Sequence, residues 1–208
     1  MRIILRLLFY IQIFFSILGC NEQLIIRDKY FNNEQIKDLD IILSYFENEI
    51  FSKVCLQNEN KKECYTKLFS ELKENVQKGY FGLDLSSKKI DSIFNKINKS
   101  TFDEIWNYNK SYTKTNTFKI VNINFQGKYM LFLYDLGFKH PIIKDYYEKI
   151  NFSGDISPSL IIGIINSGEK LNTEDIDIRQ FLAIHYITIT YQLPMEVLLG
   201  NVPNSDIK

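Results

Sequence analysis

Two cysteines, Cys55 and Cys64, have the spacing that points most directly to a chemical role. In one continuous helix, two residues 9 positions apart would be separated by about 13 Å along the axis and would lie on opposite faces. A disulfide requires Cα atoms within about 7 Å of each other. A bond between the two therefore predicts that the chain turns back over the polar stretch 56–63, giving a helical hairpin closed by the disulfide.

The competing interpretations of this pair are two free buried thiols or two ligands of a metal site. Zinc sites use cysteines about two to four residues apart or add histidines at short spacing. The only histidines, His140 and His185, stand far along the chain, and no C-x-x-C redox motif is present. The spacing therefore favours a structural disulfide, and the sequence predicts no metal and no cofactor.

The two histidines are the candidates for acid–base chemistry. His140 precedes Pro141 at an expected helix start, which is typical of a solvated loop residue, while His185 stands among apolar neighbours, as a core histidine does. The sequence contains no H-E-x-x-H, G-x-S-x-G, P-loop or dinucleotide-binding motif. An enzyme is therefore the weaker hypothesis, and no catalytic residue is assigned.

Acidic residues gather before the last helical segment, where they could hold a cation or a basic partner. They lack the glycine and the oxygen-ligand spacing of a calcium loop. Carboxylates near a helix N-terminus are expected from the helix dipole alone, so this explanation is preferred. The four residues are Glu169, Glu174, Asp175 and Asp177.

Tyrosines could line a groove for a peptide or a sugar, because a tyrosine ring offers an apolar face and a polar tip. The candidate binding residues are Tyr129, Tyr134, Tyr146 and Tyr147. The chain is rich in aromatic residues throughout, with 16 Phe and 13 Tyr. Packing in the core is therefore the commoner explanation for the same tyrosines.

The elements that must position these residues are mainly helices. Apolar residues recur at steps of three and four, which predicts a compact, bundle-like α protein with an N-terminal hairpin closed by the disulfide. Asn33, Ser157 and Thr173 are expected N-caps, and Thr101 to Glu104 resembles a capping box. The predicted helices are 33–55, 62–79, 86–97, 101–106, 129–137, 141–150, 157–165 and 173–190.

One segment is ambiguous between helix and strand. Residues 118–125 are β-branched and aromatic with partial alternation, which predicts a strand. This strand can turn at 126–128 and pair with 129–133, giving a short β-hairpin near 117–133. A helix that ends on Gly137 is the preferred interpretation of the second half. The polar residues 110–116 predict an open loop and the place of any boundary within the domain.

Composition limits the class of protein. The chain has 208 residues, of which 45% are apolar and 24% charged, with 25 basic and 25 acidic side chains. This balance excludes a disordered charged tail and gives no reason to expect nucleic acid as a partner. A chain of this length can bury a sizeable core, so residues 32–208 are expected to form one helical domain.

The N-terminal segment has the form of a secretory signal. Two arginines, Arg2 and Arg6, precede an apolar run over 7–18, and no acidic residue occurs before residue 20. The run is short for a spanning helix, which needs about 20 apolar residues. Ile17-Leu18-Gly19-Cys20 stands where bacterial lipoprotein precursors carry their lipobox, so the first twenty residues resemble that family.

The resemblance implies that cleavage falls between Gly19 and Cys20, that Cys20 receives a diacylglycerol thioether, and that its new amino end is acylated, for example with palmitate. Asn21 in place of Asp favours, by the enterobacterial sorting pattern, the outer membrane facing the periplasm. Two or more acyl chains give a stable anchor. The alternative is an ordinary cleaved signal. The expected organisation is signal peptide 1–19, lipidated tether 20–31 and the helical domain.

The favoured function is a lipid-anchored envelope protein that binds another protein, for example as an immunity protein against a delivered toxin or as an assembly factor. The alternative is a peptide- or glycan-binding lipoprotein, and a divergent envelope hydrolase centred on His140 or His185 is a third hypothesis. An exposed concave site with a histidine and two carboxylates would favour the enzyme. A flat apolar patch would favour a partner.

Overall fold

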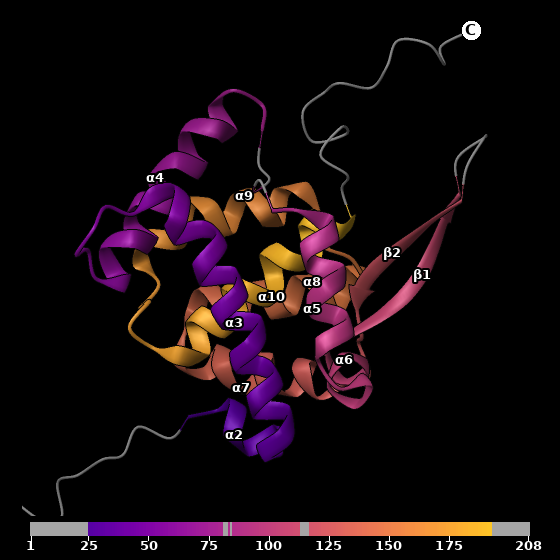
Figure 1. Cartoon of the computed structure of the whole chain (residues 1–208). Coiled ribbons are helices and arrows are strands. Elements are labelled where there is room, and N and C mark those ends of the chain that lie inside the picture. Colours follow the sequence, from indigo (N-terminus) through magenta and orange to yellow (C-terminus); the bar gives the residue numbers. More distant parts are fainter. Residues whose placement is uncertain (1–24, 81–82, 84, 113–116, 193–208) are drawn as a thin grey trace, which may run out of the picture.

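The last helix, α10 (Ile176–Gln192), forms the centre of the molecule. Of its 17 residues, 13 are buried, and they lie on every side of the helix. A helix that is apolar all round is stable only when other elements cover it completely. The computed structural model, shown in Figure 1, describes residues 25–80, 83, 85–112 and 117–192.

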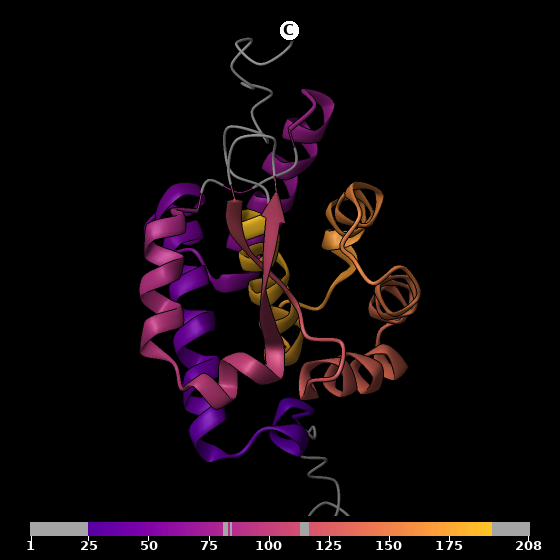
Figure 2. The ribbon, with the colours of Figure 1, turned by 90° about the vertical axis from the view of Figure 1, so that its right-hand side faces the viewer.

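The N-terminal half supplies one cover of α10. Figure 2 shows α3 and α5 on one side of the central helix. The short helix α6 continues from α5 toward the strands. The elements of this half are α2 (Arg27–Tyr30), α3 (Asn33–Val54), α4 (Lys61–Gln77), α5 (Ser87–Lys96) and α6 (Lys99–Ile105).

The C-terminal half covers the other side. Strands β1 (Trp106–Tyr112) and β2 (Thr117–Ile123) form an antiparallel hairpin in which Trp106 pairs with Ile123. Figure 2 shows the following three helices on the side of α10 opposite α3. These are α7 (Lys128–Lys139), α8 (Pro141–Ser153) and α9 (Pro158–Ser167), with a short 3-10 turn, η1, at Gly168–Lys170.

The mainly α fold, the disulfide-closed helical hairpin and a short antiparallel sheet are thus confirmed. Buried apolar residues from both sides of 110–116 belong to one core cluster, from Ile26 to Ile189. Among the described residues, no helix is both long and apolar enough to cross a membrane.

Several helix ends follow from capping chemistry. The side chains of Asn32 and Asn60 accept backbone N–H groups at the starts of α3 and α4, each within a reciprocal capping box. Ser157 caps α9 as predicted. Gly79 has a positive φ of 81° just after α4, the conformation that glycine adopts most readily at a helix end.

Two predicted helix starts were wrong. The cap of α3 is Asn32 instead of Asn33, because the Asn32 side chain reaches the N–H groups of the first turn. The last helix begins at Ile176, so Thr173 does not cap it. Instead, the carboxylate of Asp175 accepts the backbone N–H of Asp177 at 2.8 Å.

The predicted helix over 101–106 was also wrong at both ends. It begins at Lys99, and the Thr101 hydroxyl donates to buried Asp38 instead of capping the helix. It ends at Ile105, because Trp106 turns into β1. Residues 110–112, expected to be loop, therefore lie in β1, and β2 pairs with β1 instead of with 129–133, which is helical.

The packed part of the chain begins before residue 32. Ile26, Arg27 and Phe31 are buried, and α2 lies against both α3 and α7. The predicted signal peptide, the lipobox and Cys20 lie outside the described residues.

Candidate functional site

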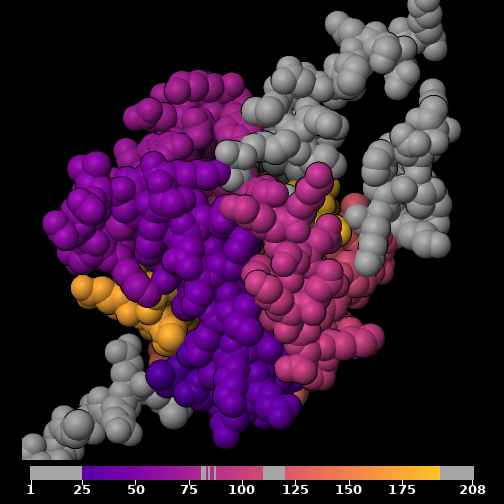
Figure 3. All heavy atoms as spheres, in the orientation of Figure 1, coloured from indigo at the N-terminus to yellow at the C-terminus, as the bar shows by residue number. Residues whose placement is uncertain are grey.

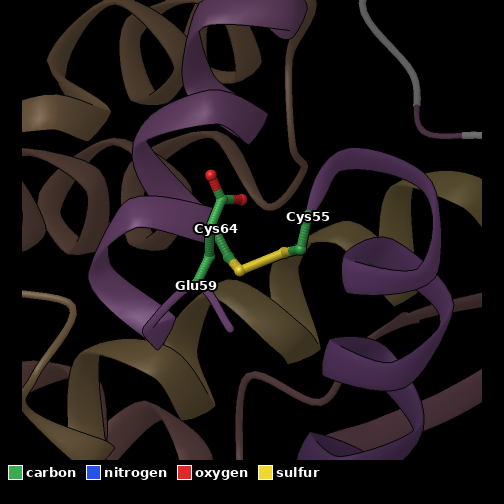
Figure 4. Close-up of side chains that lie close together, drawn as sticks. All are labelled: Cys55, Glu59 and Cys64. Atoms are coloured by element: carbon green, nitrogen blue, oxygen red, sulfur yellow. A yellow bond between two sulfur atoms is a disulfide. The ribbon is translucent and has the colours of Figure 1, made fainter. Parts of the chain in front are cut away.

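The disulfide between Cys55 and Cys64 is present and closes the turn between α3 and α4, as predicted. The two Cα atoms are 5.3 Å apart, although the residues are 9 positions apart in sequence. Figure 4 shows the bond between the end of α3 and the first turn of α4. We refer to residues 55–64 as the clamped loop.

Further contacts hold the clamped loop in one conformation. The Glu59 carboxylate accepts the backbone N–H of Leu56 at 2.8 Å and pairs with Lys67 at 2.5 Å. Both hydrogen bonds lower the pKa of Glu59, and the one from Lys67 has the larger effect. Asn58 has a positive φ of 77°, a conformation that asparagine tolerates better than most residues. Leu56 remains 69% exposed on this fixed loop.

A metal site does not fit the clamped loop. A Glu59 oxygen and the two cysteine sulfurs lie within 4.8 Å of one another, and this is the only group of three such ligand atoms in the part of the chain that the structure describes. Metals bind thiolates, and here the sulfurs are bonded to each other. The arrangement is that of a structural disulfide beside a hydrogen-bonded carboxylate.

A polar pocket of about 390 Å³ lies against the clamped loop. Figure 3 shows the segment that follows α9 beside the corner between α3 and α4. The pocket is lined by Asn60, Lys61, Lys62, Thr173, Glu174 and Arg179.

Buried Glu47 organises the cations around this pocket. Its carboxylate pairs with Lys61 at 2.6 Å and with Arg179 at 2.6 Å, and it accepts the Tyr65 hydroxyl at 3.3 Å. Glu47 therefore neutralises part of the charge of two cations, while Lys62 stays exposed at the pocket edge. We call Leu56 together with this pocket the loop surface.

The four candidate tyrosines do not form one groove. Tyr129 and Tyr146 are fully buried, and burial raises the pKa of each hydroxyl above its ordinary value. Tyr134 is 48% exposed and its ring lies 5.5 Å from the ring of half-buried Tyr147. Two of the candidates thus pack in the core and two meet at the surface.

The exposed pair belongs to a larger apolar patch on α7. Tyr134 also contacts Phe138, with ring centroids 4.9 Å apart. Leu131 and Phe138 are 53% and 71% exposed, at helical spacing from Tyr134. We call Leu131, Tyr134, Phe138 and Tyr147 the α7 aromatic face. The sequence indicated Tyr134 and Tyr147 of this face as candidate binding residues. It did not indicate Leu131 and Phe138, because their helical spacing resembles that of core residues.

Neither histidine lies in an active-site arrangement among the described residues. His185 is fully buried, and burial lowers its pKa to about 3. Its Nδ1 shares a hydrogen bond of 2.9 Å with the Tyr146 hydroxyl. His140 lies 3.6 Å from one carboxylate, that of Asp175. No second carboxylate joins it, since no other three-ligand group exists in the described ranges.

The predicted acidic group is dispersed by the fold. Glu169 pairs with Lys73 on α4, Asp175 serves the start of α10, and Glu174 lines the pocket of the loop surface. Asp177 has a role that the sequence did not indicate, at the N-terminal end of the described chain.

Asp177 fixes the segment that leads into α2. Its carboxylate accepts the backbone N–H of Ile26 at 2.7 Å and that of Arg27 at 3.1 Å. Burial raises the pKa of Asp177 in spite of these donors. Arg27, itself buried, pairs with Asp40 at 2.7 Å. The contact between Asp177 and Ile26 joins residues about 150 positions apart, so no local sequence signal could have revealed it.

A groove of about 300 Å³ lies between α8 and α9. Buried Tyr146 and Leu160 line it, half-buried Ile142 adds apolar surface, and Asp145 and Lys149 stand at its side and pair with each other. Comparison of the chain with protein-family models, with curated proteins and with solved structures found no match in any of the three.

Proposed function

We propose that this chain is a lipid-anchored protein of the bacterial envelope that binds another protein through the loop surface. The observation that carries this proposal is a clamped loop, fixed by a disulfide and by Glu59, that exposes Leu56 and contributes Lys61 and Lys62 to a pocket lined with cations. The anchor is inferred from the lipobox at Cys20.

The rigidity of the clamped loop favours protein recognition. Binding a flexible loop costs free energy because side chains and backbone must be ordered, and a loop that is already fixed avoids much of that cost. Leu56 offers apolar area to a partner's surface. Exposed Lys62 favours a carboxylate on the partner, because charge complementarity sets orientation and association rate.

Affinity capture from solubilised envelopes of the host tests this proposal. The lipidated wild type is compared with Leu56→Asp and with Lys62→Glu, two exposed positions at the loop surface. The matched control is Phe152→Asp, since Phe152 is 94% exposed on α8 and lies outside the loop surface.

The expected result is one protein that is enriched with the wild type and with Phe152→Asp and is lost with both loop variants. Mass spectrometry identifies it and also measures the lipid on Cys20. The same proteins captured by all four baits, or none by any, would refute the loop surface as the binding site. A Cys20→Ala bait separates the anchor from the contact, because it removes the lipid only.

A second candidate function is binding of a short peptide or glycan in the groove between α8 and α9, favoured by the apolar surface of half-buried Ile142 there. Gly163 lines this groove, and a side chain at that position would meet open space. Gly163→Leu is therefore expected to fill the groove without disturbing the fold. Calorimetric titration with N-acetylglucosamine oligomers and with short peptides should give binding to the wild type and none to the variant.

A further inference from the structure

The α7 aromatic face is an apolar surface that nothing in the described structure covers. Leu131, Tyr134 and Phe138 are each about half exposed or more, and the Tyr134 ring contacts both Phe138 and Tyr147 of α8. Single exposed apolar residues are ordinary, but a contiguous group marks a contact with another molecule. Phe and Leu favour an apolar environment, whereas Tyr favours a boundary between an apolar and an aqueous phase.

This face lies at the end of the molecule where the described chain starts. Asp135, between Tyr134 and Phe138 on α7, accepts from Lys29 and from the Tyr30 hydroxyl of α2, at 2.5 and 2.6 Å. Figure 1 shows α2 and α7 together at the lower end of the molecule. The Asp177 contact with Ile26 keeps the start of the chain at this end.

The distance from this end to the lipid attachment point is short. Cys20 and Ile26 are six positions apart, which covers at most about 20 Å even in a fully extended chain. A lipid on Cys20 would therefore hold Ile26, at the start of α2, within about 20 Å of the bilayer surface, and α7 adjoins α2 at this end.

We propose that the α7 aromatic face rests in the interfacial layer of the bilayer to which Cys20 is anchored. This inference depends on the proposed lipid anchor. The acyl chains supply the affinity, and the aromatic face adds a second contact that orients the domain. Tyrosine is enriched at membrane interfaces for the reason given above, and apolar faces of peripheral proteins enter roughly 5 to 10 Å into this layer.

The contact is apolar and does not depend on lipid charge. Four lysines of α2, α7 and α8 near the face have carboxylate partners, so they supply little net attraction for anionic lipids. The pairs are Lys29 with Asp135, Lys128 with Glu104, Lys144 with Glu148 and Lys149 with Asp145.

The same orientation points the clamped loop away from the bilayer. Asp40 of α3 contacts Arg27 near the anchored end, and Val54 at the other end of α3 leads into the loop. About 20 Å of helix separates Asp40 from Val54. A domain resting on α7 would therefore present the loop surface to a partner in the aqueous compartment.

Fluorescence quenching by bromine-labelled lipids tests the inference. Lipidated Phe138→Trp is reconstituted in phosphatidylcholine vesicles, with Leu56→Trp as the matched exposed control. The wild type supplies the background, because its single tryptophan, Trp106, is buried. We expect the added tryptophan at 138 to lose roughly half of its emission, given the depth above, and the one at 56 to lose almost none.

Salt and anionic lipid separate the apolar contact from an electrostatic one. Raising the salt from about 0.1 M to about 1 M, or adding phosphatidylglycerol, should leave the quenching at 138 unchanged. Quenching that disappears at high salt would overturn the apolar contact.

Three further results would overturn the inference. Equal quenching at 138 and 56 in lipidated, vesicle-bound protein would refute the orientation while leaving the anchor intact. Sedimentation of unlipidated Cys20→Ala as a dimer that Phe138→Asp dissociates would assign the face to a second copy of the chain. Absence of lipid mass on Cys20 would instead refute the anchor, and this inference with it.

Discussion

His185, which shares a hydrogen bond with Tyr146, lies in the core. The ionisation of its imidazole is coupled to folding. Burial lowers the pKa of His185 to about 3, whereas an unfolded histidine titrates near 6.5. The folded state therefore favours the neutral imidazole. Its contribution to stability is fully present above about pH 6.5 and is lost as the pH falls toward 3.

Replacing the imidazole should flatten this dependence on pH. Between about pH 6 and 4, the free energy of unfolding of the wild type should fall faster than that of His185→Leu by about 1.4 kcal/mol per pH unit. Urea unfolding at a series of pH values measures the difference. Tyr146→Phe keeps the imidazole and should keep the slope while costing about 1 kcal/mol. If the free energy of unfolding of wild type and of His185→Leu changed equally with pH, the pH dependence would not come from His185.

Asp177 holds the backbone of the N-terminal segment, and its removal should be costly. Asp177→Ala leaves the buried N–H groups of Ile26 and Arg27 without an acceptor, which should lower the free energy of unfolding by about 2 to 4 kcal/mol. Urea unfolding measures the loss, and hydrogen exchange of the two amides shows whether it is local.

Asp40→Ala is the matched control for this prediction. It removes one of the two carboxylates that pair with buried Arg27 but leaves both backbone N–H groups with their acceptor, so it should lower the free energy of unfolding less than Asp177→Ala and leave the exchange of the two amides unchanged. Equal losses in the two variants would show that Asp177 acts only through charge and not by accepting the two backbone donors.

At the scale of elements, the disulfide connects α3 to α4 across the clamped loop. Removing it in Cys55→Ser/Cys64→Ser should lower the free energy of unfolding by about 2.5 to 3 kcal/mol, because the unfolded chain regains the entropy of a short closed loop. Chemical denaturation measures this value. A reducing agent should bring the wild type to the stability of the variant and leave the variant unchanged. A variant as stable as the oxidised wild type would contradict the prediction.

The helices could be predicted largely from local patterns, because the information that specifies them is local. The helical period of apolar residues and caps such as Asn60 and Ser157 act within one or two turns. The disulfide was also predictable, since chain geometry allows few arrangements over 9 residues.

The hairpin and the candidate surfaces depend on contacts between distant residues. Trp106 follows a helical run and joins a strand only because Ile123 pairs with it and Thr188 of α10 accepts its ring N–H at 2.8 Å. The α7 aromatic face had the period of an ordinary buried helix face. Whether such a face is covered is decided by the packing of α2 and α8, which the sequence of α7 does not contain.

At the scale of the whole molecule, one core should give one unfolding transition. Trp106 on β1 reports on the hairpin and on α10, while far-ultraviolet circular dichroism reports on all helices. The two signals should follow the same curve in urea, because the core cluster extends to both sides of 110–116. Two separated transitions would instead place a domain boundary in that segment.

The central position of α10 also affects when the chain can fold. This helix occupies residues 176–192, so α3, α5 and β2, which pack directly against it, are made before that contact exists. At ordinary rates of synthesis, the first 175 residues take roughly 10 to 30 s to emerge. The core around α10 therefore cannot be completed until the last described helix has been synthesised.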